Sequence, residues 1–238
     1  MPKFIRYNTL YSFYEHIQPF LKYSLVKDDA LPENGTMIIA PHPDDESIGC
    51  GGTIIKHRQA GGNATVVFCT MDTEERRGES KAAMSLMDVD AVYLDLPVES
   101  LNRSKEFPER LATIIDQKKP GIIFLPFFLD NHTDHRAANR AAISALESIR
   151  HTCMIYAYPV WFPLYPTVII DIAAQWEQKK ELISCYRSQL ATRDYIRMSG
   201  SLAGYWAEVK GHGLSMVETF FRASSSEYAK LARKVMQW

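Results

Sequence analysis

Residues 37–52 read MIIAPHPDDESIGCGG. Four apolar residues open this stretch, and a segment rich in proline and acidic residues follows them. From about residue 45 to residue 60 we expect a helix. Gly61 and Gly62 are typical of a helix end. A short apolar strand that leads directly into a helix is the repeating unit of an α/β fold.

The same unit recurs along the chain. Further apolar runs occupy residues 64–69, 91–94, 121–125, 154–158 and 167–170. Helix-like segments separate the earlier runs, at residues 73–87, 107–118 and 134–148. Strands that are apolar on both faces and alternate with helices indicate a parallel sheet that is covered on two sides. We therefore predict a doubly wound, Rossmann-like α/β fold with a mostly parallel sheet and helices on both faces.

We expect one domain over residues 1–238, in three parts. These are an N-terminal helical extension (1–30), an α/β core (31–171) and a C-terminal helix and loop region (172–238). In the last part, a helix is predicted from residue 171 to about 188, and the glycine-rich stretch 198–213 is predicted to be a loop. The aromatic and proline-rich stretch 156–166 favours a loop or an edge segment.

Composition excludes several classes of protein. The chain has 27 basic and 28 acidic residues, a net charge of -1 and no basic stripe, so nucleic acid is not an expected partner. The four cysteines form no CxxC pair, which argues against a disulfide framework and against a cysteine-based zinc site. The longest apolar run, residues 121–129, is too short to cross a bilayer. We predict a cytoplasmic protein without an integral membrane segment.

Two motifs carry chemistry. The first, PHPDDE at residues 41–46, directly follows the first strand of the core, where open α/β sheets bind their ligands. His42 and Asp45 are three residues apart, so they can converge on one point if a helix begins near Asp44. The second motif, DNHTDH at residues 130–135, follows the fourth core strand after a short loop.

In a doubly wound sheet whose strand order reverses after the third strand, the first and fourth strands are neighbours. The two motifs should therefore meet, although about 90 residues separate them. His42, Asp45 and His135 would make a three-ligand site of the kind that binds catalytic zinc and leaves one position open for water. Such a metal lowers the pKa of the bound water to roughly 7. The same ligands also suit Fe2+.

Structural explanations of these residues remain open. The acidic residues at positions 44–46 could cap a helix and complement its dipole, and Thr133 or Asp134 could cap the next one. We interpret His57, His151 and His212 as structural, and the glycines at positions 49–52 as allowing a helix to pack closely against the sheet.

The two motifs together resemble those of the LmbE-like (PIG-L) de-N-acetylases. Weaker similarities lie at Arg76 and Glu79, at residues 186–189 and at residues 218–220, so the resemblance extends over roughly residues 37–220. Two positions depart from the family pattern: no proline lies between His132 and Asp134, and residues 86–89 read LMDV where Leu-Gly-Val is usual.

The resemblance implies a set of roles. His42, Asp45 and His135 would bind zinc, and Asp44 would be the general base. His132 would act as general acid or stabilise the developing oxyanion, and Asp134 would orient His132 and raise its pKa. Arg76 would contact the polar part of the substrate.

These roles predict a zinc-dependent hydrolase that removes the N-acetyl group from an N-acetylglucosamine-type sugar or glycoconjugate and releases acetate. Its partner would be that small molecule. Two alternatives remain: an amidase for another small amide, such as a thiol-sugar conjugate, and a non-catalytic carbohydrate-binding α/β module. The sequence does not identify the sugar or the oligomeric state.

Overall fold

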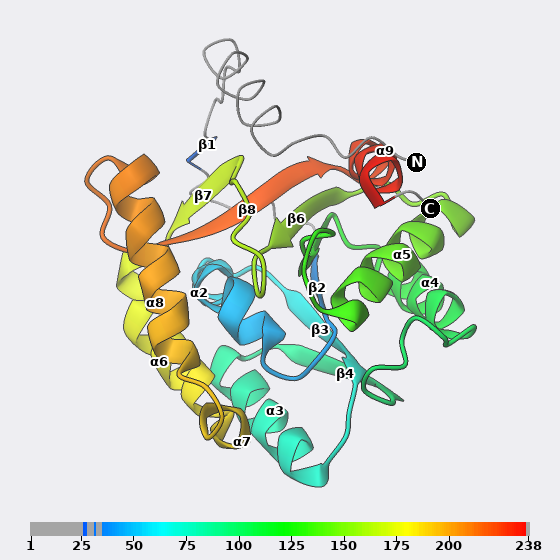
Figure 1. Cartoon of the computed structure of the whole chain (residues 1–238), viewed down its shortest axis with the longest axis horizontal. Helices are drawn as coiled ribbons and strands as arrows, with labels where there is room; N and C mark the ends of the chain where they lie inside the picture. Colours follow the sequence, from blue (N-terminus) through cyan, green and yellow to red (C-terminus); the bar gives the residue numbers. More distant parts are fainter. Residues whose placement is uncertain (1–25, 28–30, 32–34, 237–238) are drawn as a thin grey trace, which may run out of the picture.

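The computed structural model describes residues 26–27, 31 and 35–236, and its centre is one eight-stranded sheet (Figure 1). The strand order is β1-β7-β8-β6-β5-β2-β3-β4. The strands are β1 (Val26–Lys27), β2 (Thr36–Ala40), β3 (Ala64–Thr70), β4 (Asp90–Leu96), β5 (Ile122–Pro126), β6 (Met154–Tyr158), β7 (Val168–Asp171) and β8 (Val217–Ser224). All neighbouring strands run parallel except β8, which is antiparallel to both β6 and β7.

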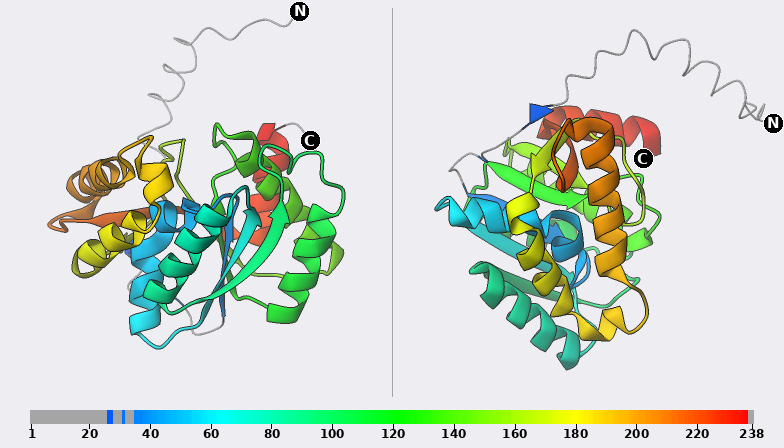
Figure 2. Two further views of the ribbon diagram at one scale, coloured as in Figure 1. Left: turned by 90° about the horizontal axis from the view of Figure 1, so that it is seen from below. Right: turned by 90° about the vertical axis from the view of Figure 1, so that its left-hand side faces the viewer.

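Helices cover both faces of this sheet (Figure 2). They are α2 (Asp45–Gln59), α3 (Glu74–Met87), α4 (Phe107–Lys118), α5 (Thr133–Ser148), α6 (Trp176–Ser184), α7 (Arg187–Leu190), α8 (Tyr195–Trp206) and α9 (Ser225–Met236), with short turns η2 (Ala173–Gln175) and η3 (Ala207–Gly211). One apolar core joins the sheet to α4, α5 and α9. A second core joins its other face to α2, α3 and α6. The predicted doubly wound, mostly parallel fold is confirmed.

The predicted strand order around the first motif is also confirmed. β2, the first core strand, pairs in parallel with β3 on one side and with β5 on the other. Because β5 is the fourth core strand, the segments that follow β2 and β5 leave the sheet side by side. Each predicted strand is present, with ends within two residues of the predicted ones.

Helix α2 lies almost entirely inside the molecule, and every residue from Asp45 to Ile55 is buried. Its glycines make this possible, as predicted. A Cβ atom at Gly49 would overlap the ring of Tyr158, and one at Gly52 would lie 2.9 Å from Ile172 Cδ1. The position of α2 is therefore determined by close contact with its neighbours.

The region 172–238 differs from the expected helix and loop region. It supplies β8, which fills the gap between β6 and β7. The loop predicted at residues 198–213 is wrong, because helix α8 runs through residue 206. Gly200 lies inside α8, where its Cβ position is 3.0 Å from the ring of Trp176, so this glycine serves helix packing. Apart from β1, the predicted N-terminal helical extension lies outside the described residues.

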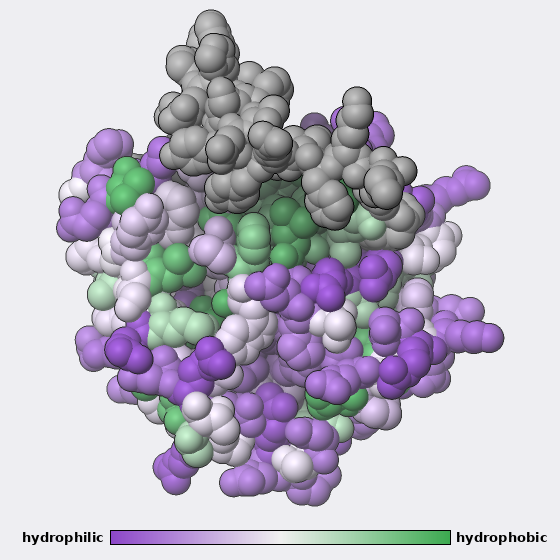
Figure 3. All heavy atoms as spheres, viewed as in Figure 1, coloured by the Kyte–Doolittle hydropathy of each residue, from purple (hydrophilic) through white to green (hydrophobic). Residues whose placement is uncertain are grey.

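Three of the four cysteines are buried, and Cys185 is partly exposed. None of the described cysteines is disulfide-bonded. Within the described residues, no helix has both the length and the apolar content needed to span a membrane. In the view of Figure 3, hydrophilic side chains cover most of the lower half of the described surface, and hydrophobic ones gather in the upper half.

Candidate metal centre and active site

Three side chains from the two motifs converge at the ends of β2 and β5. His42 Nδ1 lies 3.2 Å from Asp45 Oδ2, and His135 Nε2 lies 3.2 Å from the same oxygen. His135 Nε2 is 3.3 Å from His42 Nδ1. In a tetrahedral zinc site, with bonds of about 2.0–2.1 Å, ligand atoms are roughly 3.3–3.4 Å apart. The three donor atoms therefore have the spacing that one such cation requires.

Each imidazole also has a carboxylate oxygen 3.2 Å from its other nitrogen. His42 Nε2 lies 3.2 Å from Asp134 Oδ2, and His135 Nδ1 lies 3.2 Å from Asp130 Oδ1. A carboxylate behind a histidine fixes its ring orientation and tautomer, an arrangement typical of metal-binding histidines. This position of Asp130 behind His135 does not follow from the sequence, although the residue opens the second motif.

The electrostatics of the cluster follow from these contacts. Burial alone would lower the pKa of His42, but hydrogen bonds to Asp134 and Asp45 outweigh it and raise the pKa to about 9. The pKa of His135 is likewise raised to about 10, against the effect of burial, by Asp45 and Asp130. The two imidazoles, despite the opposing effect of burial, keep the pKa of Asp45 below its usual range.

Asp44 differs from its neighbour Asp45 in its contacts and in the direction of its pKa shift. It occupies the position before the first turn of α2, but its side chain makes no capping hydrogen bond. Burial and the adjacent Asp45 raise the pKa of Asp44 well above its ordinary value, and Arg76 only partly opposes this. The capping explanation considered for this residue is therefore excluded, and the carboxyl group is available for chemistry.

The backbone at Asp44 is strained, with φ of 125°. Two neighbours hold it there: Asp44 N donates to Glu46 Oε2 at 3.1 Å, and Arg76 Nη2 donates to Pro43 O at 2.7 Å. Tyr186 in turn donates to Glu46 Oε1 at 2.6 Å. Strain of this kind persists only where surrounding contacts enforce it, as they do at many functional sites.

His132 borders the cluster, with its ring centroid 4.6 Å from that of His42. Each of His42, His132 and His135 has a ring nitrogen that lies within 4.8 Å of a ring nitrogen of the other two. His132 Nδ1 accepts a hydrogen bond from Asp134 N at 3.2 Å, so this ring caps α5.

The expected role of Asp134 is corrected by these contacts. Its carboxylate accepts from the backbone of Glu99 at 2.6 Å and of Leu101 at 3.2 Å and faces His42, so it orients His42 instead of His132. The pKa of His132 is lowered, not raised, because burial and the nearby His42 and His135 disfavour its charged form. The sequence could not show this, because the direction of each carboxylate is decided by packing.

A cleft of about 160 Å3 opens onto this cluster. It is lined by His42, Asp44, Asp45, Ile48, Arg76, Val98, His132, Val160, Trp161, Gln189 and Tyr195. Arg76 lines the cleft, and its guanidinium lies near Pro43 O, Asp44 and Asp72. The aromatic stretch after β6 contributes Trp161, whose backbone N donates to Asp130 Oδ2 at 3.0 Å.

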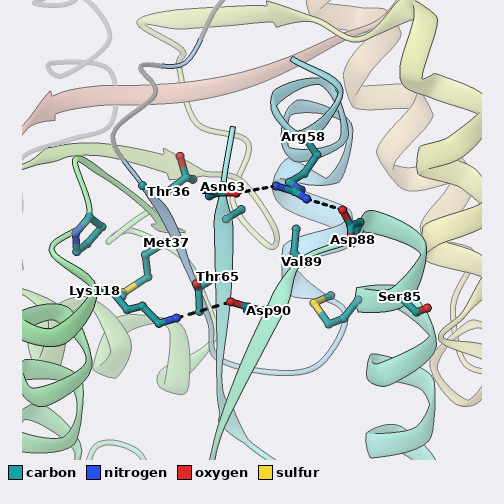
Figure 4. Close-up of a pocket in the computed structure, with 14 residues that line it drawn as sticks. Thr36, Met37, Arg58, Asn63, Thr65, Ser85, Asp88, Val89, Asp90 and Lys118 are labelled. Atoms are coloured by element: carbon teal, nitrogen blue, oxygen red, sulfur yellow. Dashed lines mark hydrogen bonds and ion pairs between the residues drawn. The ribbon is translucent and has the colours of Figure 1, made fainter. Parts of the chain in front are cut away.

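A larger cavity, of about 580 Å3, lies at the opposite ends of the strands (Figure 4). Thr36 and Thr65 line it, together with the Arg58–Asp88 and Lys118–Asp90 ion pairs. None of the candidate residues of either motif lines this cavity. Because ligands in open α/β sheets bind at the carboxyl ends of strands, the smaller cleft is the candidate active site.

Of the other histidines that the structure describes, His57 and His151 have structural contacts, as expected, and His212 does not. His57 Nε2 is 3.3 Å from both Thr36 Oγ1 and Asn63 O, and His151 Nε2 is 2.8 Å from Pro120 O. His212 is exposed and lies in a left-handed turn. None of these three histidines lines the cleft.

Comparison with known proteins agrees with the motifs. Residues 37–146 match the family model of GlcNAc-PI de-N-acetylase, PIG-L, which confirms the resemblance. The diacetylchitobiose deacetylase of Thermococcus kodakarensis is 25% identical over 213 residues, covering 74% of this chain and 79% of that protein.

Solved structures confirm the fold. The N,N'-diacetylchitobiose deacetylase of Pyrococcus horikoshii, solved with an inhibitor, aligns with a TM-score of 0.70 at 24% identity, covering 82% of this chain and 85% of that one. The 4-carboxy-2-hydroxymuconate hydratase of Pseudomonas putida aligns equally well, with a TM-score of 0.70 at 19% identity over 80% of this chain and 96% of that one. One fold thus serves a deacetylase and a hydratase, so function must be inferred from the site.

Proposed function

We propose, since residues 37–146 match the family model of GlcNAc-PI de-N-acetylase (PIG-L), that this chain is a metal-dependent hydrolase that removes the acetyl group from an N-acetylated amino sugar. The observation that carries the proposal is the triangle of donor atoms from His42, Asp45 and His135, with sides of 3.2–3.3 Å. The similarity to a diacetylchitobiose deacetylase supports the choice of substrate.

We assign the cation to zinc, because two imidazoles and a carboxylate with this spacing suit it and leave a coordination position open. Fe2+ accepts the same donors, so zinc and iron are to be compared by experiment. When bound, the metal would polarise the amide carbonyl and lower the pKa of a water molecule in the open position.

Asp44 is the group that we expect to take a proton from the attacking water. Its carboxyl group lines the cleft beside Asp45 and makes no capping bond. Its raised pKa makes the carboxylate a stronger proton acceptor than an ordinary aspartate. It can then return this proton to the leaving nitrogen, so a single group would act first as base and later as acid.

His132 is better suited to binding the oxyanion than to acting as the acid. Its Nδ1 accepts the hydrogen bond from Asp134 N, so in the neutral ring the hydrogen is on Nε2. The lowered pKa favours this neutral form. An N–H donor placed where negative charge develops typically contributes about 3–4 kcal/mol to lowering the barrier. Of the two roles that the family resemblance left open, this chain supports the second.

The lining of the cleft suits a sugar. Arg76 and Gln189 offer polar groups, whereas Trp161, Tyr195 and Val160 offer apolar surface. A pyranose ring carries both kinds of surface. The cleft's volume of about 160 Å3 is below the roughly 300–1,000 Å3 of sites that enclose a whole drug-sized ligand. We infer that the acetamido end enters and that the rest of a larger glycoconjugate lies outside.

The test is acetate release from a panel of N-acetylglucosamine conjugates and acyclic acetamides, with and without a chelator, by the wild type and by Asp44→Asn. We expect release from the sugars that stops with chelator, resumes with zinc, and falls at least about 100-fold in Asp44→Asn, while bound zinc is unchanged. Unimpaired release in chelator would contradict the metal mechanism. Release from acyclic amides alone would favour the amidase alternative, and sugar binding without release would favour the binding module.

A further inference from the structure

We propose that Gln189 determines specificity in this cleft: its side-chain Oε1 accepts a hydrogen bond from a ring hydroxyl of the substrate sugar. Gln189 is half-buried on α7 and lines the cleft. The inference rests on the proposed function, because it names the part of an N-acetylated sugar that the same site would recognise.

Neighbouring residues fix the orientation of the Gln189 amide. Ser188 N donates to Glu79 Oε1 at 2.7 Å, and Ser188 Oγ donates to Glu79 Oε2 at 2.7 Å. A serine hydroxyl has one hydrogen, and this hydrogen is used on the Glu79 carboxylate. Toward any other partner Ser188 Oγ can therefore only accept.

The partner is the side chain of Gln189, whose Nε2 lies 3.1 Å from Ser188 Oγ. The two ends of a glutamine amide are otherwise interchangeable, but only the nitrogen can donate to a hydroxyl that must accept. Ser188 thereby determines that Nε2 faces it and that Oε1 faces away. Among the described residues, none donates a hydrogen bond to Gln189 Oε1.

Because Gln189 lines the cleft, we infer that this oxygen is offered to a ligand there, which must bring an O–H or N–H group. Arg76 and Glu79 lie one turn apart on α3. Arg76 Nη2 is 3.8 Å from Asp44 Oδ1, whereas Glu79 accepts the hydrogen bond from Ser188, the residue that Gln189 contacts. The N–H of the reacting amide belongs beside Asp44, so we place Gln189 against the sugar beyond it. The donor it recognises is then a ring hydroxyl.

Glu79 and Ser188 are positioning residues in this scheme. They touch no substrate, and they act by preventing the glutamine amide from turning over. A site built to accept a hydrogen bond rejects an analogue that lacks the donor, because a polar group is then left unpaired. The hydrogen bonds that link Glu79, Ser188 and Gln189 would in this way make the site prefer amino sugars over other acetamides.

The experiment compares kcat/KM for an N-acetylglucosamine glycoside and its 3-, 4- and 6-deoxy analogues, using the wild type and Gln189→Met. Methionine keeps the length of the side chain and removes its acceptor. We expect the wild type to discriminate against one deoxy analogue by roughly 5- to 150-fold. Gln189→Met should lose that preference, so that its kcat/KM values for the glycoside and for this analogue become similar. Gln178→Met, at an exposed glutamine on α6 that pairs with Gln59, is the matched control.

A second pair of variants tests the positioning. Ser188→Ala should lose most of the same preference because the amide can turn over, and Ser188→Thr should restore it. The inference would be overturned if Gln189→Met ranked the analogues by kcat/KM as the wild type does. It would also be overturned if the variant lost kcat/KM equally on all the analogues and on N-acetylethanolamine. Failure of the proposed function would differ, since the wild type itself would then release no acetate from any of the sugars.

Discussion

At the residue scale, two adjacent aspartates show how the surroundings set chemistry. Asp45 faces two imidazoles, and its pKa lies below the usual range. Asp44 is equally buried but faces Asp45, and its pKa is raised. In the proposed mechanism the same side chain would be a metal ligand at one position and a proton carrier at the next. Groups whose surroundings push their pKa values apart are typical of acid–base sites.

Asp130 is the residue whose importance only the contacts reveal. Its Oδ1 lies 3.2 Å from His135 Nδ1 and accepts from His132 N at 2.9 Å. We predict that Asp130→Asn weakens zinc binding about 10- to 100-fold, because the ring of His135 loses the carboxylate that orients it. Competition with a chromophoric chelator measures the affinity. Asp116→Asn, an exposed aspartate that pairs with Lys119, should leave it unchanged, and equal affinities in the two variants would contradict this role.

At the scale of elements, α2 is the helix on which the centre depends. It begins at Asp45, directly after the loop that carries His42, and is buried along most of its length. Its glycines were expected to serve packing, and the contact of Gly49 with Tyr158 bears this out. Tyr158 also donates to Ile39 O of β2 at 2.9 Å, which ties helix and strand together near the motif.

Two glycines in helices make a matched test. We predict that Gly49→Ala costs about 1–3 kcal/mol of unfolding free energy, since the added methyl group overlaps Tyr158. Gly78→Ala on α3 has no atom within 4 Å of the new Cβ and should stabilise the protein by up to about 1 kcal/mol through helix propensity. Urea unfolding gives both values. Equal and small changes would show that α2 can shift to accommodate the methyl group.

At the scale of the whole molecule, the C-terminal region is joined to α2 by a buried ion pair. Glu218 on β8 accepts from Gly52 N at 2.9 Å and from Thr53 N at 2.7 Å. Lys179 on α6 donates to Glu218 and, at 2.8 Å, to Ile48 O. Both charged side chains are buried and contact backbone groups of α2, so residues 172–238 help to hold the helix that follows the His42 loop.

We predict that Glu218→Ala lowers the free energy of unfolding by about 3–5 kcal/mol, because it leaves the charge of Lys179 buried without its partner. Adding Lys179→Met should recover part of the loss, since the unpaired charge is removed. Denaturant unfolding of the two variants measures the effect. Glu147→Ala, which breaks the exposed pair with Arg233, should cost less than about 1 kcal/mol. A similar small cost at Glu218 would mean that the buried pair contributes no more than a surface one.

The sequence predicted some elements of the fold well and others not at all. The strands around β2 were predicted to within two residues, because apolar runs and the helices between them are local patterns. Helix α8 was missed, because Gly200 is typical of a loop unless the neighbouring Trp176 is known. Strand β8 was missed as well, because it joins the sheet antiparallel and outside the strand–helix alternation.

The sequence by itself determined the doubly wound sheet and the meeting of His42, Asp45 and His135, because strand order and residue spacing place both motifs at one edge. Only the tertiary structure decided that Asp134 supports His42, that Asp130 stands behind His135 and that Gln189 turns its oxygen away from Ser188. The physical reason is that backbone position follows from local periodicity. The direction of a side chain depends on partners contributed by segments distant in the sequence, which packing brings within hydrogen-bonding distance.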